Sequence, residues 1–248
     1  MDRLIYVGMT AAKHTIAQLA ATSQNIANVE TTGFKADVNV FSAIPVYGPG
    51  NPTREFVVNS MAGADFSSGT ITQTGNPLDL AITGQGWFAV QLPDGSTAYT
   101  RDGSFRIDPN GQLQTENGLP VMGENGTITI PPNTDVTIGK DGTVSTVPSG
   151  ENTKTSVTIL GRLMLVNPAE ADLVKGQDNL FRTKSGKPAQ PDPTVRVMPG
   201  SLESSNVNMV ESMISIINLS RAFEMQMKLL QSADSNSSKA SVLLNINA

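Results

Sequence analysis

One short segment has the glycine spacing of a dinucleotide-binding loop. Gly84, Gly86 and Ala89 stand at the positions of a G-x-G-x-x-A fingerprint. In that fingerprint the glycines open a helix whose N-terminus binds phosphate. Here Trp87 to Leu92 have the pattern of a strand instead. The segment therefore predicts a β-turn and no nucleotide cofactor.

Two acidic motifs could also carry chemistry. Asp108, Asn110 and Gly111 resemble the start of a calcium loop, but the glycine comes two residues early and no glutamate follows at the required spacing. A hairpin turn is the prediction. Arg101 and Asp102 could form half of an acid–base pair, yet the spacing implies no second carboxylate. We therefore predict a turn or a surface ion pair there.

The composition narrows the possible chemistry further. The chain has 248 residues and no cysteine, which excludes disulfides, thiolate catalysis and cysteine-based metal sites. Its one histidine, His14, lies off the apolar stripe of its segment and predicts a solvated or interfacial side chain. A net charge of −5 without any run of Lys or Arg argues against nucleic acid as a partner. We predict no catalytic residue, no metal site and no cofactor.

The N-terminal segment lacks the features of a cleaved signal peptide. The apolar run from Leu4 to Met9 is too short for a signal-peptide core, and no suitable cleavage site follows it. No stretch approaches the roughly 20 apolar residues of a membrane span. We expect no direct membrane span, and export, if it occurs, without cleavage.

Residues 1–35 predict an amphipathic helix and its end. Ile5, Ala12, Leu19 and Ile26 are seven residues apart, the repeat of one heptad position. Met9 and Ile16 occupy a second heptad position between them. Gly33 can adopt the positive φ that ends such a helix.

Residues 201–248 predict a second helix. Asn208 is a suitable N-cap, and Glu211 three residues later completes a pattern like a capping box. An apolar stripe follows on one face, interrupted by Ser220 and Asp234, with Gln226 off the stripe. Its members are Met209, Met213, Ile216, Phe223, Met227 and Leu230.

The region between the helices predicts a β structure. Residues 75–200 contain short apolar segments separated by turns of the Asp-Gly and Asn-Gly type, which favours an antiparallel sandwich or irregular barrel. Residues 36–74 are rich in Gly, Pro, Ser and Thr without clear periodicity, and predict an extended connector. The fold class is therefore α+β, with a central antiparallel β-rich domain between two terminal helices.

Each terminal helix needs a partner. A large apolar side chain contributes about 1.5–3 kcal/mol when buried, whereas each ordered backbone residue costs about 1–2 kcal/mol. A helix of about 25 residues with a single apolar stripe is therefore marginal alone. The partner is the other terminus in a coiled-coil-like inner domain, neighbouring subunits, or the chain's own β domain, and periodicity does not choose between these.

Several segments resemble the flagellar rod and hook proteins. Ser23 to Lys35 is similar to the N-terminal signature of that family, and Thr74 to Phe88 is similar to the entry of its central domain. Tyr99 to Phe105 and Asp108 to Leu113 continue the second match. Gly200 to Asn208, with the helix that follows, is similar to the C-terminal segment. The matches come in the family order and cover most of the chain.

The resemblance implies a structural subunit. Such a protein passes through the flagellar type III export apparatus without cleavage and assembles in the periplasm into a helical tube in the basal body. Its partners are copies of itself and neighbouring rod proteins. The terminal helices would line the tube, and the end of the signature would lie where subunits meet. The predicted assembly interface is Ile5, Met9, Ala12, Ile16, Leu19, Ile26, Asn28, Gly33, Phe34, Met209, Met213, Ile216, Phe223, Met227 and Leu230.

Two other classes of function remain open on the residues alone. A periplasmic β-rich hydrolase would need a pocket with two acidic groups of perturbed pKa. A soluble binding module would keep its terminal helices as a private pair. A subunit that polymerises instead makes the same contact repeatedly between copies.

Overall fold

The computed structural model describes residues 2–45, 55–148 and 157–245, and the chain forms two compact units. The helical unit comprises Met1–Asn28, Asp37–Ala64 and Val207–Ala248. The β unit comprises Val29–Ala36 and Asp65–Asn206. The predicted α+β class is confirmed.

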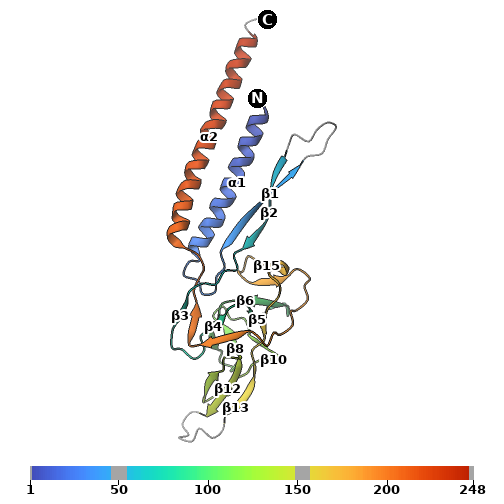
Figure 1. Cartoon of the computed structure of the whole chain (residues 1–248), viewed down its shortest axis with the longest axis vertical. Coiled ribbons are helices and arrows are strands. Elements are labelled where there is room, and N and C mark those ends of the chain that lie inside the picture. Colours follow the sequence, from blue (N-terminus) through green and yellow to red (C-terminus); the bar gives the residue numbers. More distant parts are fainter. Residues whose placement is uncertain (1, 46–54, 149–156, 246–248) are drawn as a thin grey trace. The chain divides into compact units, whose positions relative to one another are not determined.

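Two helices dominate the helical unit. α1 spans Asp2–Ala27 and α2 spans Met209–Asn245. They lie side by side and run antiparallel (Figure 1). The predicted N-cap is confirmed, because the Asn208 Oδ1 accepts hydrogen bonds from the backbone N–H groups of Val210 and Glu211, at 3.1 and 3.3 Å.

A hairpin completes the helical unit. β1 (Asp37–Pro45) and β2 (Glu55–Ala64) pair antiparallel, from Asp37 opposite Ala64 to Pro45 opposite Glu55. The ring of His14 on α1 lies edge-on to Phe41 of β1, with a centroid distance of 5.0 Å. The predicted connector thus contains two long paired strands that its composition did not indicate. Their pairing is satisfied by backbone hydrogen bonds, which need no alternating apolar pattern.

The β unit is built from short strands. They are β3 (Ile71–Gln73), β4 (Leu80–Thr83), β5 (Trp87–Gln91), β6 (Thr97–Thr100), β7 (Phe105–Ile107), β8 (Leu113–Thr115), β9 (Met122–Gly123), β10 (Gly126–Thr127), β11 (Thr134–Ile138), β12 (Thr143–Pro148), β13 (Thr158–Arg162), β14 (Leu165–Val166), β15 (Leu173–Lys175), β16 (Phe181–Thr183), β17 (Arg196–Pro199) and β18 (Ser201–Glu203). A single 3₁₀ turn, Glu170–Asp172, precedes β15.

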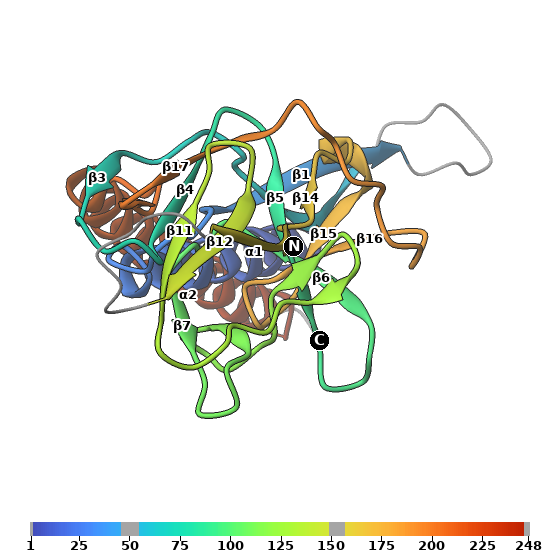
Figure 2. The same cartoon turned by 90° about the horizontal axis from the view of Figure 1, so that it is seen from below.

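These strands form several small antiparallel sheets. The largest has the order β14-β5-β6-β16-β15, and a second has the order β11-β12-β13. Figure 2 shows β4 beside β17 and β11 beside β12. β3 pairs with β18, so the strands nearest the C-terminal helix in sequence close onto strands from the start of the unit.

The core of the β unit lies between these sheets. Phe88 and Phe105 belong to this core and meet edge-on, with a centroid distance of 5.1 Å. The core also includes Leu80, Ile82, Leu113, Val121, Ile128, Ile130, Ile138, Val144, Leu163, Leu165, Val195 and Val197. The predicted hairpin turn at Asp108 is confirmed, because β7 and β8 pair across it and the Asp108 carboxylate accepts from the Asn110 and Gln112 amides.

Candidate functional site

The face of α1 that contacts α2 carries small side chains. Gly8, Ala12 and Thr15 stand at i, i+4 and i+7 and are buried. The Thr15 hydroxyl and the Gln226 side chain hydrogen-bond at 3.1–3.2 Å. A Cβ added at Gly8 would lie 2.7 Å from a methyl carbon of Leu230. The helices therefore approach each other closely through a narrow row of small residues.

Two large side chains of the predicted N-terminal stripe remain outside this contact. Met9 and Ile16 are 53% and 52% exposed, whereas Leu19 and Ile26 are half-buried. Ile5 lies in α1, but its side chain is outside the described residues. The helix pair within the chain thus leaves Met9 and Ile16 free to contact another surface.

The predicted stripe of α2 is divided in the same way. Ile216, Phe223 and Leu230 are half-buried, whereas Met209, Met213 and Met227 are exposed. The structure adds a second exposed apolar row that we did not predict, although its spacings of four, three and eight residues also keep it on one helix face. That row is Val210, Ile214, Ile217 and Met225.

The end of the N-terminal signature lies in the β unit or at its border. Asn28 bonds through its backbone N–H and its side chain to the Gln24 carbonyl oxygen, just after α1. Gly33 has φ of +65°, as predicted, and Phe34 is 3% exposed. The Lys175 ammonium lies 3.9 Å from the centre of the Phe34 ring. Gly33 and Phe34 are therefore buried within the chain itself.

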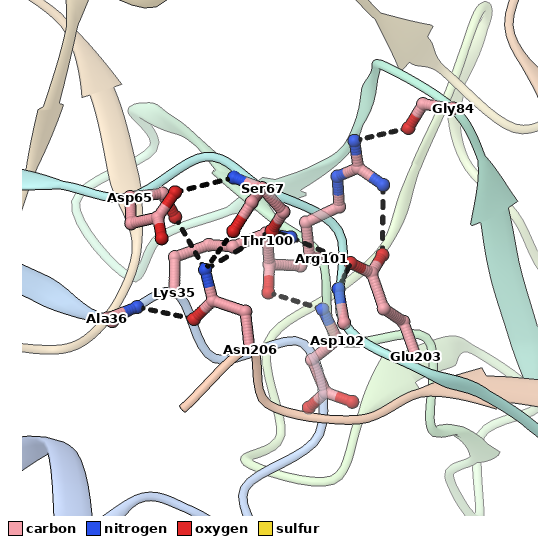
Figure 3. A network of polar contacts seen from close by, with 11 residues as sticks. Lys35, Ala36, Asp65, Ser67, Gly84, Thr100, Arg101, Asp102, Glu203 and Asn206 are labelled. Carbon is pink, nitrogen blue, oxygen red and sulfur yellow. Dashed lines mark hydrogen bonds and ion pairs between the residues drawn. The ribbon is translucent and has the colours of Figure 1, made fainter. Parts of the chain in front are cut away.

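A buried charge cluster joins distant segments of the β unit (Figure 3). The Glu203 carboxylate accepts from the Lys35 Nζ at 2.7 Å and from the Arg101 Nη1 at 2.9 Å. Its Oε1 also accepts from the Gly69 backbone N–H. All three charged side chains are at most 3% exposed. The Glu203 carboxylate is therefore hydrogen-bonded and neutralised by two buried cations, Lys35 and Arg101.

Burial opposes both positive charges of this cluster. Burial lowers the pKa of Lys35, and the hydrogen bond and charge of Glu203 oppose that shift. Burial likewise lowers the pKa of Arg101 against the attraction of Glu203. The Arg101 guanidinium also lies over the Trp87 ring, 5.3 Å from its centre, and donates to the Gly84 carbonyl oxygen. The buried positive charges of Lys35 and Arg101 therefore depend on the Glu203 carboxylate for their stabilisation.

The surface ion pair expected at Arg101 and Asp102 is therefore wrong. Arg101 pairs in the interior with Glu203, 102 residues away, which local spacing could not reveal. Asp102 accepts from the Ser104 amide and hydroxyl in a local turn, and burial raises its pKa. The signal that sequence reasoning missed was the appearance of Lys35, Arg101 and Glu203 in three separate segments that resemble the family.

The remaining motifs have structural roles in the described part of the chain. Gly84 and Gly86, with φ of +82° and +140°, connect β4 to β5, and a strand follows them as predicted. The His14 Nε2 lies 3.1 Å from the carbonyl oxygen of Val57. Among the described residues, no three His, Cys, Asp or Glu side chains group as a metal site. No described helix combines the length and apolarity needed to cross a membrane.

Three family models match the chain. The flagella basal body rod protein model matches residues 5–35, the flagellar hook protein FlgE/F/G D1 domain matches residues 81–146, and the flagellar basal body rod FlgEFG protein C-terminal model matches residues 198–243. A flagellar basal-body rod protein FlgF of Escherichia coli K12 is 45% identical over 99% of this chain and its own full length. The chain belongs to the flagellar basal-body rod protein family.

Further relatives place the chain within the family. The FlgF of Salmonella typhimurium LT2 is 42% identical over 99% of this chain and all of its own length. A FlgG of Buchnera aphidicola from Schizaphis graminum is 34% identical over 96% of this chain and 98% of its own length. The segments Met1 to Tyr6 and Arg221 to Lys228 predict similarity to FlgF rather than FlgG, and these identities confirm it. The chain is thus a structural subunit of the flagellar basal-body rod.

The charge cluster connects all three matched segments. Lys35 lies in the N-terminal match, Arg101 in the D1 match and Glu203 in the C-terminal match. Because the three charges are buried together, the N-terminal and C-terminal matches meet inside the β unit. The cluster fixes where the chain enters and leaves that unit.

Proposed function

We propose that this rod subunit polymerises through its terminal helices into a helical tubular drive shaft. The observation that carries the proposal is the row of large apolar side chains that α1 and α2 leave exposed, including Met9, Ile16 and Met213. Exposed apolar rows of this length mark surfaces that bind other proteins. In a rod the occupants are other copies of this chain and neighbouring rod proteins, joined by a repeated head-to-tail contact.

The same proposal assigns the remaining parts of the chain. The α1 and α2 pair forms a coiled-coil-like inner domain, and the half-buried side chains of Leu19, Ile26, Ile216, Phe223 and Leu230 contribute to it. The β unit forms the outer part of the tube. Asn28, Gly33 and Phe34 lie near the place where subunits meet.

A charge in the exposed row tests the proposal. Met213 is 48% exposed, so the Met213→Asp substitution changes little inside the isolated chain. In an assembly that buries the row, an unpaired carboxylate costs several kcal/mol. We expect cells that carry Met213→Asp to lose motility and their purified basal bodies to lack the chain, while the purified variant keeps its β-sheet circular dichroism.

The matched control is Gln231→Asp, a polar position of the same helix that is also exposed. Its basal bodies should retain the chain. Normal assembly of the Met213→Asp variant would show that this row is not an assembly surface.

The proposal extends to the route of the chain. The chain passes through the flagellar type III export apparatus without a cleaved signal and assembles in the periplasm. A lack of cysteine suits a chain that is exported unfolded, because no disulfide has to be broken. Mass spectrometry of the chain from purified basal bodies tests this route. Loss of the segment around Leu4 would indicate cleavage and contradict it.

A further inference from the structure

Four covalent links join the helical unit and the β unit: one lies between Asn28 and Val29, and the other three lie after Ala36, before Asp65 and after Asn206. Ala36, Asp65 and Asn206 belong to the β unit, and each stands next to a covalent link to the helical unit. We call them the crossing residues. They are far apart in sequence, so nothing in the covalent chain keeps them together.

A closed triangle of hydrogen bonds connects the crossing residues, and Figure 3 shows the two that the Asn206 side chain makes. The Asp65 backbone N–H donates to the Ala36 carbonyl oxygen at 2.8 Å. The Ala36 N–H donates to the Asn206 Oδ1 at 2.8 Å. The Asn206 Nδ2 donates to the Asp65 carbonyl oxygen at 2.9 Å. Each crossing residue is therefore bonded to both of the others.

Only a side-chain amide can complete this triangle at position 206. The Asn206 oxygen accepts from one crossing residue while its nitrogen donates to the other, and the same nitrogen also lies within hydrogen-bond distance of the Ser67 carbonyl and hydroxyl oxygens. A carboxylate of the same shape would keep the first bond, but it would have no hydrogen to donate to the carbonyl oxygens of Asp65 and Ser67.

The backbone on either side of this amide is held in place. The Asn206 N–H donates to the Phe34 carbonyl oxygen at 3.3 Å. Three residues earlier, Glu203 is anchored by Lys35 and Arg101 in the buried charge cluster. The side chain of Asn206 is therefore mounted on a fixed segment from which it can hold two other segments.

We propose that Asn206 is a positioning residue that clamps these three crossing residues, so that load from α2 and from the β1–β2 hairpin packed beside α1 enters the β unit through all three of them together. Without the clamp, each of the three crossing segments transmits force alone and can separate from the β unit independently of the other two. The inference rests on the proposed role of the helices as the assembly elements. It adds a residue that acts in transmitting force rather than in binding the neighbouring subunit.

The first test compares two asparagines that are two residues apart. In Asn206→Asp the bonds donated by the side chain are lost, and we expect the Asp65 amide to exchange with solvent about tenfold faster or more. Amides of the core strands β5 and β6 should exchange at the wild-type rate. In the control, Asn208→Asp, the side chain only accepts hydrogen bonds at a helix N-terminus, where aspartate serves equally well.

The second test measures the clamp under load. Cells with Asn206→Asp should incorporate the chain into basal bodies but swim progressively worse than wild type as the viscosity of the medium rises. Asn206→Ala, which removes the bonds without adding a charge, should behave in the same way and covers the case in which the aspartate variant does not fold.

Four results would overturn the clamp. Unchanged exchange at Asp65 in both Asn206 variants, or equal acceleration in β5 and β6, would show that Asn206 has no local role at the crossings. Wild-type swimming in viscous medium would show that no load passes through it. Basal bodies that lack the variant chain would place its role in assembly instead. Failure of the proposed function is seen separately, in the Met213→Asp experiment.

Discussion

Glu203 and Lys35 are 168 residues apart in the sequence, yet their side chains form an ion pair of 2.7 Å that is 1% exposed on each side. Arg101 completes the cluster on the other carboxylate oxygen. One carboxylate thereby neutralises cations from the beginning and the middle of the chain. The β unit consequently depends on residues that lie beside both terminal helices in sequence.

The first prediction removes that carboxylate. Glu203→Gln leaves Lys35 and Arg101 buried without a counter-charge, and breaking a buried pair in this way costs about 3–5 kcal/mol. Urea denaturation followed by tryptophan fluorescence measures the loss, because Trp87 lies beside Arg101 in the β unit.

The control for Glu203→Gln is an exposed ion pair of the same unit. Asp178 and Arg182 are 41% and 39% exposed, so Asp178→Asn should cost less than about 1 kcal/mol. Equal losses in the two variants would show that the buried cluster has no special weight in the stability of the β unit.

The second prediction concerns Gly33. Its φ of +65° is unfavourable for other residues, and an added Cβ would overlap the Arg101 carbonyl carbon and the Asp102 nitrogen. Because backbone atoms cannot move aside locally, we expect Gly33→Ala to lower the free energy of unfolding by about 3 kcal/mol or more.

Gly186 provides a matched comparison for Gly33. Its φ is +68°, but no atom lies within 4 Å of an added Cβ. Gly186→Ala should therefore show only the conformational cost of about 1–2 kcal/mol. If both glycine variants lose the same stability, the close approach of the two backbones at Gly33 is not what requires glycine.

The elements predicted correctly are those whose signals are local. Asn208 marks the start of α2, Gly33 follows the end of α1, and the turn residues around Asp108 separate β7 from β8. Each signal depends on a backbone conformation or hydrogen bond within a few residues. The residues near each of these elements are therefore enough to predict it.

The features that were missed depend on long-range pairing. Nothing near Arg101 shows that its partner is Glu203. In the hairpin, polar and apolar residues alternate only from Asp37 to Val40, which is too short a run to indicate two long strands. The heptad pattern of α1 predicted Met9, Ala12 and Ile16 as one interface, but the structure separates buried Ala12 from the other two. Periodicity identifies a helix face without identifying its partner.

The third prediction uses pH and Asp102. Burial raises its pKa above the ordinary value of 3.8, so its contribution to stability is full below that value and is lost as pH rises through the raised pKa. Asp102→Asn keeps an acceptor for Ser104 and removes the charge. Urea midpoints should favour the variant at about pH 7, and this advantage should vanish at about pH 3.

Asp192 should behave in the opposite sense. Hydrogen bonds from the Thr194 hydroxyl and amide lower its pKa below 3.8, so its contribution is present above that value and is lost as pH falls through the lowered pKa. Asp192→Asn should therefore be less stable than wild type at neutral pH and approach it in acid. The same pH profile for both variants would contradict the assignment of burial as the cause at Asp102.

The last prediction concerns the isolated chain in dilute solution. Among the described side chains of α1 and α2, the buried apolar ones are Ala12 and Ala233, and alanines bury little area. The helices contain 26 and 37 residues, and ordering the backbone costs about 1–2 kcal/mol for every residue. Their pairing within one chain therefore stabilises them only weakly, whereas the β unit has an extensive core.

We expect amides of α1 and α2 to exchange orders of magnitude faster than those of β5 and β6, measured by hydrogen exchange with mass spectrometry. Slow exchange should appear in the helices only when the chain is in basal bodies. Uniform protection in the isolated chain would show that the helices are stable as a private pair, and it would remove the reason for linking their folding to assembly.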